Sequence, residues 1–520
     1  MQHNKDFIKL NIAIALASVI LGIGFWSLKN ITQSPTYTSN GTSNASSSSD
    51  STGNSDVQMS IGDKILLKRE IAVDNSAFQS AKENGVRAMA NKNYPEAVKF
   101  FEEALTIQRN APETRIYLNN AKIGAESAYT IAVAVPAIPQ NNFNRGGANR
   151  HPANALEMLR GFAQAQEEIN QPDKRINGKR IKLLIVDDND NRDNAANVAR
   201  QLISNKNIIG VMGHRLTPVS KIAAPLYAKE KVVFIAPTGI YSDLNRSDYA
   251  LNPDNRKRYV FRTDTDSEIA QKQLADYLES QNIKKVAIFY DSSKEITYSQ
   301  ELRRDFMKFF ENKSQGREVI DSIDIATLDD KFFDKGKVDR VIQKGAEAIL
   351  ILPNFNSRES ALNIISAMPP KSSGKSVQLI GDVSNLYRSI TLSQGEKAEG
   401  MVMAVATQLT EQNKFYQDAL SLWGGKIDLA WQTATSYDAA QIFIQALKGI
   451  QAQNRNVDRE AIQEQICSKD FKATAASGET LQFDCDISST PKDRVKLVQV
   501  TAPDPSKPNS EYSFKLVQNK

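Results

Sequence analysis

The residue types that most often carry catalysis or bind metals are sparse in this sequence. The three histidines, His3, His151 and His214, show none of the short spacings of metal ligands. The acidic run Asp187–Asp190 could suggest a calcium loop, but the glycine and the distal glutamate that complete such a loop are missing, so a loop at a strand end fits better. No phosphate loop and no serine-nucleophile motif is present. We therefore expect a protein that is not an enzyme and that needs no metal or other cofactor.

The overall composition is that of a globular protein. With 520 residues, the chain is too long for one ordinary core, so we expect more than one folded unit. The net charge of +5 is spread thinly and no basic arm is present, so we expect no nucleic-acid partner. Two cysteines cannot build a disulfide scaffold or a four-thiolate zinc site, but in an oxidising compartment Cys467 and Cys485 could form one disulfide that clips a hairpin.

The N-terminal residues predict export. Leu10–Leu28 is almost wholly apolar and long enough to span a bilayer, which takes about 20 residues. Lys5 and Lys9 precede it and predict a cytoplasmic N-terminus. An uncleaved anchor (residues 1–30, inserted through 7–28) competes with a cleaved signal peptide, and the length of the run and the lack of a cleavage site favour the anchor. We expect a single-pass protein of the cytoplasmic membrane with its body on the periplasmic or extracellular side.

Two segments follow the predicted anchor. Residues 31–74 begin with a tract rich in serine, threonine, asparagine and glycine, and we predict a flexible linker there. Residues 75–127 have a helical pattern. Within it, small and aromatic residues follow the spacing of one tetratricopeptide repeat, namely Gly85, Ala88, Tyr94, Ala97, Phe101 and Ala104. This region resembles a tetratricopeptide unit that docks on a protein partner, and the alternative is a plain helical hairpin that serves as a spacer.

Residues 128–520 alternate between short apolar runs and amphipathic stretches. The runs rich in β-branched residues predict strands at Ile131–Val135, Ile181–Val186, Ile208–Met212, Val232–Ile235, Val286–Tyr290, Ala348–Leu352 and Val377–Ile380. The stretches between them predict helices at Ala153–Ile169, Asn194–Ser204, Ser267–Glu279, Tyr298–Phe310 and Arg358–Met368. Apolar strands bounded by helices are typical of parallel sheets covered on both faces, and their number suggests two such sheets.

Several segments of this region resemble the type I periplasmic binding proteins, in the branch of the leucine/isoleucine/valine receptors of ABC transporters. The similar segments are Leu159–Ala163, Glu168–Asn170, Ile176–Ile181, Asp187–Asp188, Val211–His214, Tyr259–Thr263, Lys285–Asp291 and Ala398–Val402. The resemblance implies two doubly wound α/β lobes joined by crossing strands. We place one lobe at about 128–262 plus about 396–458, and the other at about 263–395 plus the C-terminal part. The family binds its ligand between the lobes, and open α/β sheets bind ligands at the carboxyl ends of their strands.

The resemblance implies ligand contacts after two strands of the first lobe. Thr217 stands where the family has a hydroxyl residue at a helix start that holds the ligand carboxylate, and helix N-termini favour anions. The alternative for Thr217 is a helix N-cap. Thr238 and Gly239 stand where the family offers backbone groups. Ile240 replaces the expected hydroxyl residue, which puts a standard α-amino-acid pose in doubt unless Thr238 or Ser242 compensates.

Three further contacts are implied in the second lobe. Tyr298 resembles the aromatic that opens a helix and closes the cleft, and the alternative is a tyrosine in the core. Phe355 or Asn356 would line the pocket in place of the family's usual residues. Asp382 matches the acidic position that faces the ligand's ammonium group, and the alternative is an aspartate that caps the following residues.

Two functions fit these observations. In the first, the protein is an extracytoplasmic receptor that captures an amino acid, an amide or a related small polar solute and presents it to the permease subunits of an ABC transporter. In the second, it is a membrane-anchored sensor or scaffold that uses the same fold for signalling. We expect the first function and keep the second as its alternative, because the predicted anchor and helical region are unusual for a freely diffusing receptor and would suit a protein that docks a partner.

Overall fold

The computed structural model describes residues 57–71, 75–137, 153–239, 244, 247–293, 297–326, 336–369, 377–410, 412–425, 429–491, 494–506 and 510–518. In these ranges no helix is both long enough and apolar enough to cross a membrane. The predicted anchor at residues 1–30 lies outside the described residues.

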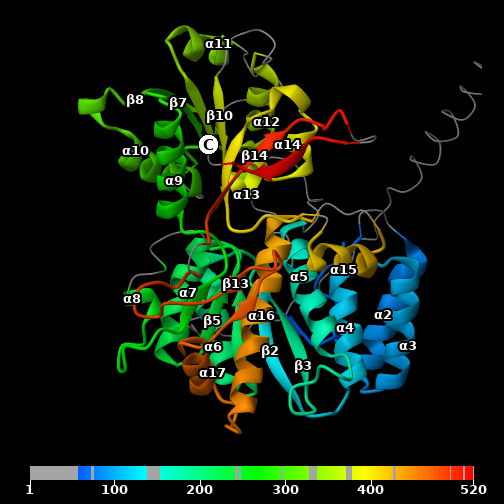
Figure 1. The fold of residues 1–520 in the computed structure, drawn as a ribbon. Coiled ribbons are helices and arrows are strands. Elements are labelled where there is room, and N and C mark those ends of the chain that lie inside the picture. The colour runs from blue at the N-terminus through cyan, green and yellow to red at the C-terminus, as the bar shows by residue number, and fades with distance from the viewer. Residues whose placement is uncertain are drawn as a thin grey trace, which may run out of the picture. The chain divides into compact units, whose positions relative to one another are not determined.

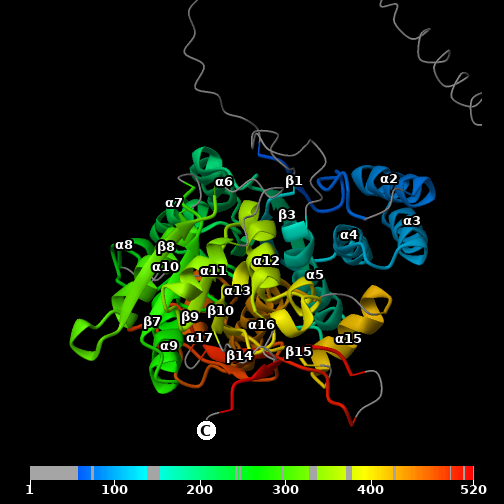
Figure 2. The same ribbon diagram turned by 90° about the horizontal axis from the view of Figure 1, so that it is seen from above.

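Three helices form a small unit near the N-terminus. They are α2 (Ser76–Ala90), α3 (Tyr94–Ile107) and α4 (Pro112–Ile123). The side chain of Asn75 caps α2 by accepting a hydrogen bond from the Phe78 N–H. Gly85 lets α2 approach α3, because a Cβ atom there would lie 2.6 Å from the ring of Phe101. In both views α4 lies between α3 and the long helix α5 (Ala153–Ile169), so the unit packs on the first sheet domain through α4 (Figures 1 and 2).

The chain that precedes this unit differs from our expectation. We predicted a flexible linker up to residue 74, but β1 (Met59–Ser60) pairs with an edge of the first sheet, and Leu66 and Leu67 are only 2% and 1% exposed. The linker prediction is therefore wrong for residues 57–71. The apolar residues here are few, and most of the groups that hydrogen-bond to this segment lie more than 40 residues further along the chain.

The first sheet has six strands in the order β1-β3-β2-β4-β5-β6. After β1, its strands are β2 (Ala128–Val135), β3 (Arg180–Asp187), β4 (Ile208–Gly213), β5 (Val233–Ala236) and β6 (Val260–Arg262). All are parallel except β1, which runs antiparallel to β3. The surrounding helices are α5, α6 (Arg192–Ser204), α7 (Thr217–Lys229), α8 (Ser247–Ala250), α15 (Lys414–Trp423), α16 (Trp431–Ala452) and α17 (Arg459–Ile466).

The second sheet has seven strands in the order β15-β14-β11-β10-β9-β7-β8. They are β7 (Lys285–Tyr290), β8 (Glu318–Asp324), β9 (Ala348–Leu352), β10 (Gln378–Gly381), β11 (Val402–Val405), β14 (Lys496–Thr501) and β15 (Ser513–Leu516). Its helices include α9 (Ser267–Ser280), α10 (Tyr298–Phe310), α11 (Gly336–Gln343), α12 (Arg358–Ala367), α13 (Val383–Leu386) and α14 (Ser389–Leu392). Alternate residues of the central strands enter two separate apolar clusters, so both faces of this sheet are covered (Figure 1).

One boundary between the lobes is corrected by the sheet pairing. We assigned residues 396–458 to the first lobe, but β11 pairs with β10 and β14 in the second sheet. The chain therefore returns to the first lobe only after β11. The chain then crosses to the second lobe once more to form β14 and β15, which agrees with our assignment of the C-terminal part of the chain to that lobe. β11 is a short apolar strand, and its sequence does not show which of two parallel sheets it joins.

Candidate functional site

The loop between β4 and α7 is held by a buried polar network. Gly213 has a φ of +120°, and a Cβ atom there would lie 2.0 Å from the Ala134 carbonyl oxygen, so only glycine fits at the end of this strand. His214 follows and is fully buried, with Nδ1 2.8 Å from Asp188 Oδ2 and Nε2 3.2 Å from the Tyr227 hydroxyl. This network fixes the backbone that leads into α7. The carboxylates of Asp188 and Asp190, just after the end of β3, thus bond to His214 and Arg215 of this loop, which agrees with a loop at a strand end.

Thr217 is the first residue of α7, and Leu216 occupies the N-cap position. Thr217 therefore does not cap this helix, which was the alternative to ligand binding. Pro218 has no N–H group, and the N–H groups of Val219 and Ser220 bond to the Leu216 carbonyl oxygen. No hydrogen bond of the Thr217 hydroxyl occurs among the described residues, and the residue as a whole is 5% exposed. A hydroxyl group without a partner at a helix start can bind a carboxylate.

Thr238 and Gly239 follow β5, and their polar groups bond within the first lobe. The Thr238 hydroxyl donates a hydrogen bond to the Arg215 carbonyl oxygen at 2.8 Å, which joins this loop to the one that carries Thr217. The Gly239 carbonyl oxygen accepts from Arg262 Nη1 at 3.2 Å. Ile240, the third predicted contact here, lies outside the described residues. The structure therefore gives Thr238 and Gly239 a part in shaping the loop.

Asp382 and Tyr298 contact each other at the ends of their elements in the second lobe. Asp382 is 3% exposed and caps α13, because its carboxylate accepts hydrogen bonds from the N–H groups of Ser384 and Asn385 and from the Asn385 side-chain amide. The Tyr298 hydroxyl donates to the same carboxylate and lies 2.7 Å from Ser384 Oγ. Burial raises the pKa of Asp382, and the hydrogen bonds oppose this shift. The capping alternative is therefore what the structure contains, and the carboxylate has its partners without an ammonium group.

The predicted contact Asn356 lies in a short 3-10 turn after β9 and is exposed, whereas its neighbour Asn354 is 1% exposed. The side chain of Phe355 lies outside what the structure describes.

A cavity of about 290 Å³ lies where α7 and α10 face each other, and residues of both lobes line it. The first lobe contributes Arg192, Pro218, Lys221, Ile222 and Tyr249, and the second contributes Thr297 and Glu301. Pro218 and Thr297 are the sequence neighbours of Thr217 and Tyr298. The cavity therefore adjoins two predicted contacts, and its size is near the lower end of the range of about 300–1,000 Å³ for small-molecule sites. Lys221 lies one helical turn from Thr217 on α7, and this four-residue spacing is present in the sequence.

The crossing between the lobes is rich in buried polar groups. Asp264 follows β6 and is fully buried, with Oδ1 accepting from the Thr265 N–H at 2.7 Å. Its Oδ2 atom has no hydrogen-bond partner in the described part of the chain, and burial raises its pKa to about 7. Alongside it, Arg494 donates to the Thr263 carbonyl oxygen at 3.0 Å and pairs with Asp438 of α16. Hydrogen bonds thus join the connecting segments to the first lobe.

Cys467 and Cys485 form a disulfide with a Cα–Cα distance of 5.6 Å. Cys467 ends α17, and the chain after Cys485 leads to Ser489, whose carbonyl oxygen accepts from the Arg262 N–H at 2.7 Å. The disulfide thereby anchors the segment that bonds to the lobe crossing. In the ranges that the structure describes, no group of three or more histidine, cysteine, aspartate or glutamate residues could hold a metal ion.

Residues 147–504 match the family model described as periplasmic binding protein. Among solved structures, a substrate-binding protein of an ABC transporter from Desulfitobacterium hafniense, in complex with Leu, is 20% identical with a TM-score of 0.53 and covers 75% of this chain and 100% of its own. A leucine-binding protein from Thermotoga maritima has 20% identity and a TM-score of 0.53, covering 75% and 98%. A solute-binding protein of an ABC transporter from Rhodopseudomonas palustris, in complex with benzoate, has 14% identity and a TM-score of 0.55, covering 76% and 98%. None of the curated protein sequences compared matches this chain.

Proposed function

Because this chain belongs to the periplasmic binding protein family, we propose that it captures a small solute with a carboxylate group between its two α/β lobes. The family consists of non-enzymatic ligand-binding proteins whose bodies lie outside the cytoplasm. The proposed pocket opens between the first turns of α7 and α10. There, Thr217 offers its hydroxyl and N–H groups to the carboxylate, and Tyr298 approaches from the second lobe.

The observation that carries this proposal is the unused hydroxyl group of Thr217. A hydrogen bond from a hydroxyl group to a charged acceptor is worth about 1.5–3 kcal/mol, so a ligand carboxylate that accepts from Thr217 gains this free energy when it binds. The positive end of α7 favours an acceptor with negative charge. The charged side chains that line the adjoining cavity are Arg192, Lys221 and Glu301, so positive charge exceeds negative charge there and adds to this preference.

The contacts of Asp382 indicate whether the ligand must carry an ammonium group. Its carboxylate already accepts hydrogen bonds from Tyr298, Ser384 and Asn385, so it does not require the ammonium group of an α-amino acid. We therefore place carboxylates without an α-amino group beside amino acids as candidate ligands. Solved relatives of the same fold include one in complex with Leu and one in complex with benzoate, and both of these ligands carry a carboxylate.

In the transport form of this proposal, the closed and liganded protein delivers its solute to the permease subunits of an ABC transporter. The predicted anchor would hold the protein at the outer face of the cytoplasmic membrane. The second candidate function, a membrane-anchored sensor or scaffold, is favoured by the packing of α4 against α5, which joins the helical unit to the ligand-binding lobe. Permease binding that requires ligand supports transport, and a ligand-dependent change in hydrogen exchange of α2 and α3 supports sensing.

A thermal-shift screen with matched solutes tests the ligand class. Leucine, isocaproate and isocaproamide share one carbon skeleton, and isocaproate lacks the ammonium group while isocaproamide also lacks the negative charge. Benzoate, benzamide, other amino acids, short peptides and urea complete the panel. A ligand that binds only the folded state raises the unfolding midpoint. We expect carboxylates to raise it and their amides to leave it unchanged, and a rise with amides alone would overturn the carboxylate proposal.

A further inference from the structure

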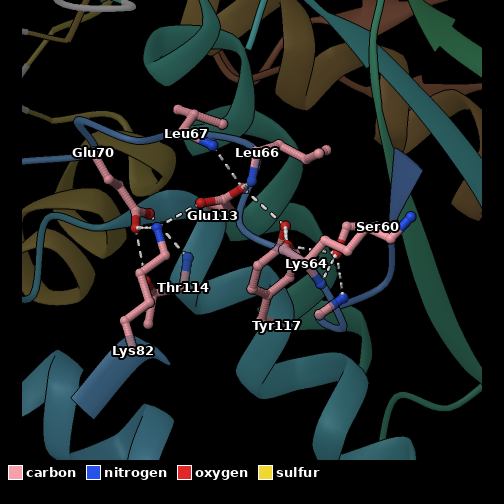
Figure 3. A network of polar contacts seen from close by, with 10 residues as sticks. Ser60, Lys64, Leu66, Leu67, Glu70, Lys82, Glu113, Thr114 and Tyr117 are labelled. Carbon is pink, nitrogen blue, oxygen red and sulfur yellow. Dashed lines mark hydrogen bonds and ion pairs between the residues drawn. The ribbon is translucent and has the colours of Figure 1, made fainter. Parts of the chain in front are cut away.

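Residues 57–71, here called the strap, lie against α2, α4 and the edge of the first sheet (Figure 3). The strap begins at the sheet, where Met59 and Ser60 pair with β3 and the Asp187 N–H donates to the Gln58 carbonyl oxygen at 2.9 Å. A turn follows, in which the Ser60 hydroxyl donates to the Lys64 carbonyl oxygen at 2.8 Å and accepts from the Gly62 N–H at 2.9 Å. The strap thus has local structure of its own as well as contacts with distant elements.

The strap and α4 exchange hydrogen bonds that neither can make alone. The N-cap of α4 is Ala111, which has no side-chain acceptor. Glu70 of the strap supplies one, because its carboxylate accepts from the Thr114 N–H at 2.9 Å and from the Thr114 hydroxyl at 2.7 Å. In return Glu113, in the first turn of α4, accepts from the N–H groups of Leu66 and Leu67 at 2.8 and 3.0 Å. The strap therefore acts as a cap for α4, and α4 satisfies the strap's buried backbone.

A buried lysine joins the two carboxylates. Lys82 of α2 is 1% exposed, and its Nζ lies 2.5 Å from both Glu70 Oε2 and Glu113 Oε2. Burial by itself lowers the pKa of Lys82, but the two carboxylates outweigh it, so that the pKa is raised. Removing one member of a buried ion pair leaves an uncompensated charge and is strongly destabilising. Lys82 therefore makes the contact of the strap with α4 depend on α2 as well.

Two side chains of α4 extend the contact to the rest of the strap and to the first lobe. The Tyr117 hydroxyl lies 2.7 Å from the Lys64 carbonyl oxygen and 2.8 Å from Glu113 Oε1, and it donates to one of them at a time. The Asn120 amide donates both to the Ile61 carbonyl oxygen at 3.0 Å and to the Leu183 carbonyl oxygen of β3 at 2.7 Å. One side chain thus joins the strap, α4 and the sheet.

We propose that the strap is a peptide bound in cis, which fills the groove between α2, α4 and β3 and locks the helical unit onto the first lobe. The mode of binding combines strand addition at a sheet edge with buried apolar and charged anchors, as in the recognition of separate peptides. The consequence is that this groove is already occupied. A protein partner of the helical unit must therefore bind another face or displace the strap. This inference does not depend on which solute the lobes bind.

The test separates the strap from the rest of the protein. A protease site is inserted between Ile71 and Asn75 of the full chain, the purified protein is cleaved, and size-exclusion chromatography shows whether the N-terminal fragment stays bound. We expect it to co-elute with the body. Lys82→Met should weaken its retention on the order of 100-fold or more, because a buried partner is lost. Lys68→Met removes the same charge from an exposed position of the strap and should leave retention unchanged.

A second measurement covers the case in which Lys82→Met unfolds the helical unit. The cleaved wild-type protein is incubated with a labelled synthetic peptide of residues 57–71. We expect this peptide to displace the fragment, and the same peptide with Glu70→Gln to do so at least about tenfold less well, because a charged acceptor is lost. Immediate release of the fragment on cleavage, or equal displacement by both peptides, would overturn the proposal. Binding in cis would also be contradicted if the uncleaved chain eluted as a dimer in which each strap occupies the groove of the other copy.

Discussion

Replacing Thr217 with valine separates ligand binding from stability. Valine keeps the shape and the β-branch of threonine but exchanges the hydroxyl group for a methyl group. Since the hydroxyl has no hydrogen-bond partner in the described residues, its loss should change the free energy of unfolding of the ligand-free protein by less than about 0.5 kcal/mol. In the complex, a hydrogen bond to a charged group is lost, which is worth about 1.5–3 kcal/mol. We therefore expect the Kd to rise roughly 10- to 150-fold.

Isothermal titration with the tightest-binding carboxylate of the panel gives the Kd, and urea denaturation of the ligand-free protein gives the stability. Thr238→Val is the matched control, because its hydroxyl does have an internal acceptor at 2.8 Å. It should lower the free energy of unfolding by about 1 kcal/mol and change the Kd less than Thr217→Val does. A Kd for Thr217→Val within threefold of the wild type, with stability unchanged, would refute our assignment of the carboxylate site.

Three further predictions follow from buried groups. Asp382→Asn replaces an oxygen that accepts two hydrogen bonds from Asn385, and should lower the urea-derived free energy of unfolding of the ligand-free protein by about 1–3 kcal/mol; unchanged stability would contradict its capping role. The pKa of Asp264 is raised to about 7, so its contribution to stability is full below its unfolded value near 4 and is lost as the pH rises to about 7. Asp264→Asn should remove up to about 4 kcal/mol of this pH dependence, and an unaltered stability profile between pH 4 and 7 would contradict it. Intact-mass analysis of exported protein should show Cys467 and Cys485 oxidised, and two free thiols would contradict the disulfide.

Much of the two-lobed architecture could be predicted, because the strands of parallel sheets are apolar on both faces and stand out from amphipathic helices. The runs around Ile181–Val186 and Ala348–Leu352 became β3 and β9 within two residues of the predicted bounds. Helices such as α5 and α10 matched the predicted ranges for the same reason.

The strap could not be predicted, since its sequence is mixed and its stabilising partners are remote. From the sequence, Glu70 has the features of an ordinary charged surface residue. Only the structure shows that α4 lacks a capping side chain of its own and that Glu70 supplies one. Asp382 shows a related difficulty. An aspartate after a strand can face a ligand or cap the next turn, and only the position of the Asn385 N–H distinguishes the two roles. The orientation of a side chain depends on packing between elements, which local sequence patterns do not contain.

The most direct test of our central claim is the distance between the two lobes during a solute titration. Labels at Lys206 and Lys313, both exposed and located in the first and second lobes, report this distance. Cysteine variants at the two positions are labelled with the native disulfide oxidised and titrated with leucine, isocaproate, benzoate and their amides. We expect at least one carboxylate to shorten the distance saturably, with Thr217→Val shifting the midpoint to higher concentration. A distance that no carboxylate changes would contradict capture of such a solute between the lobes.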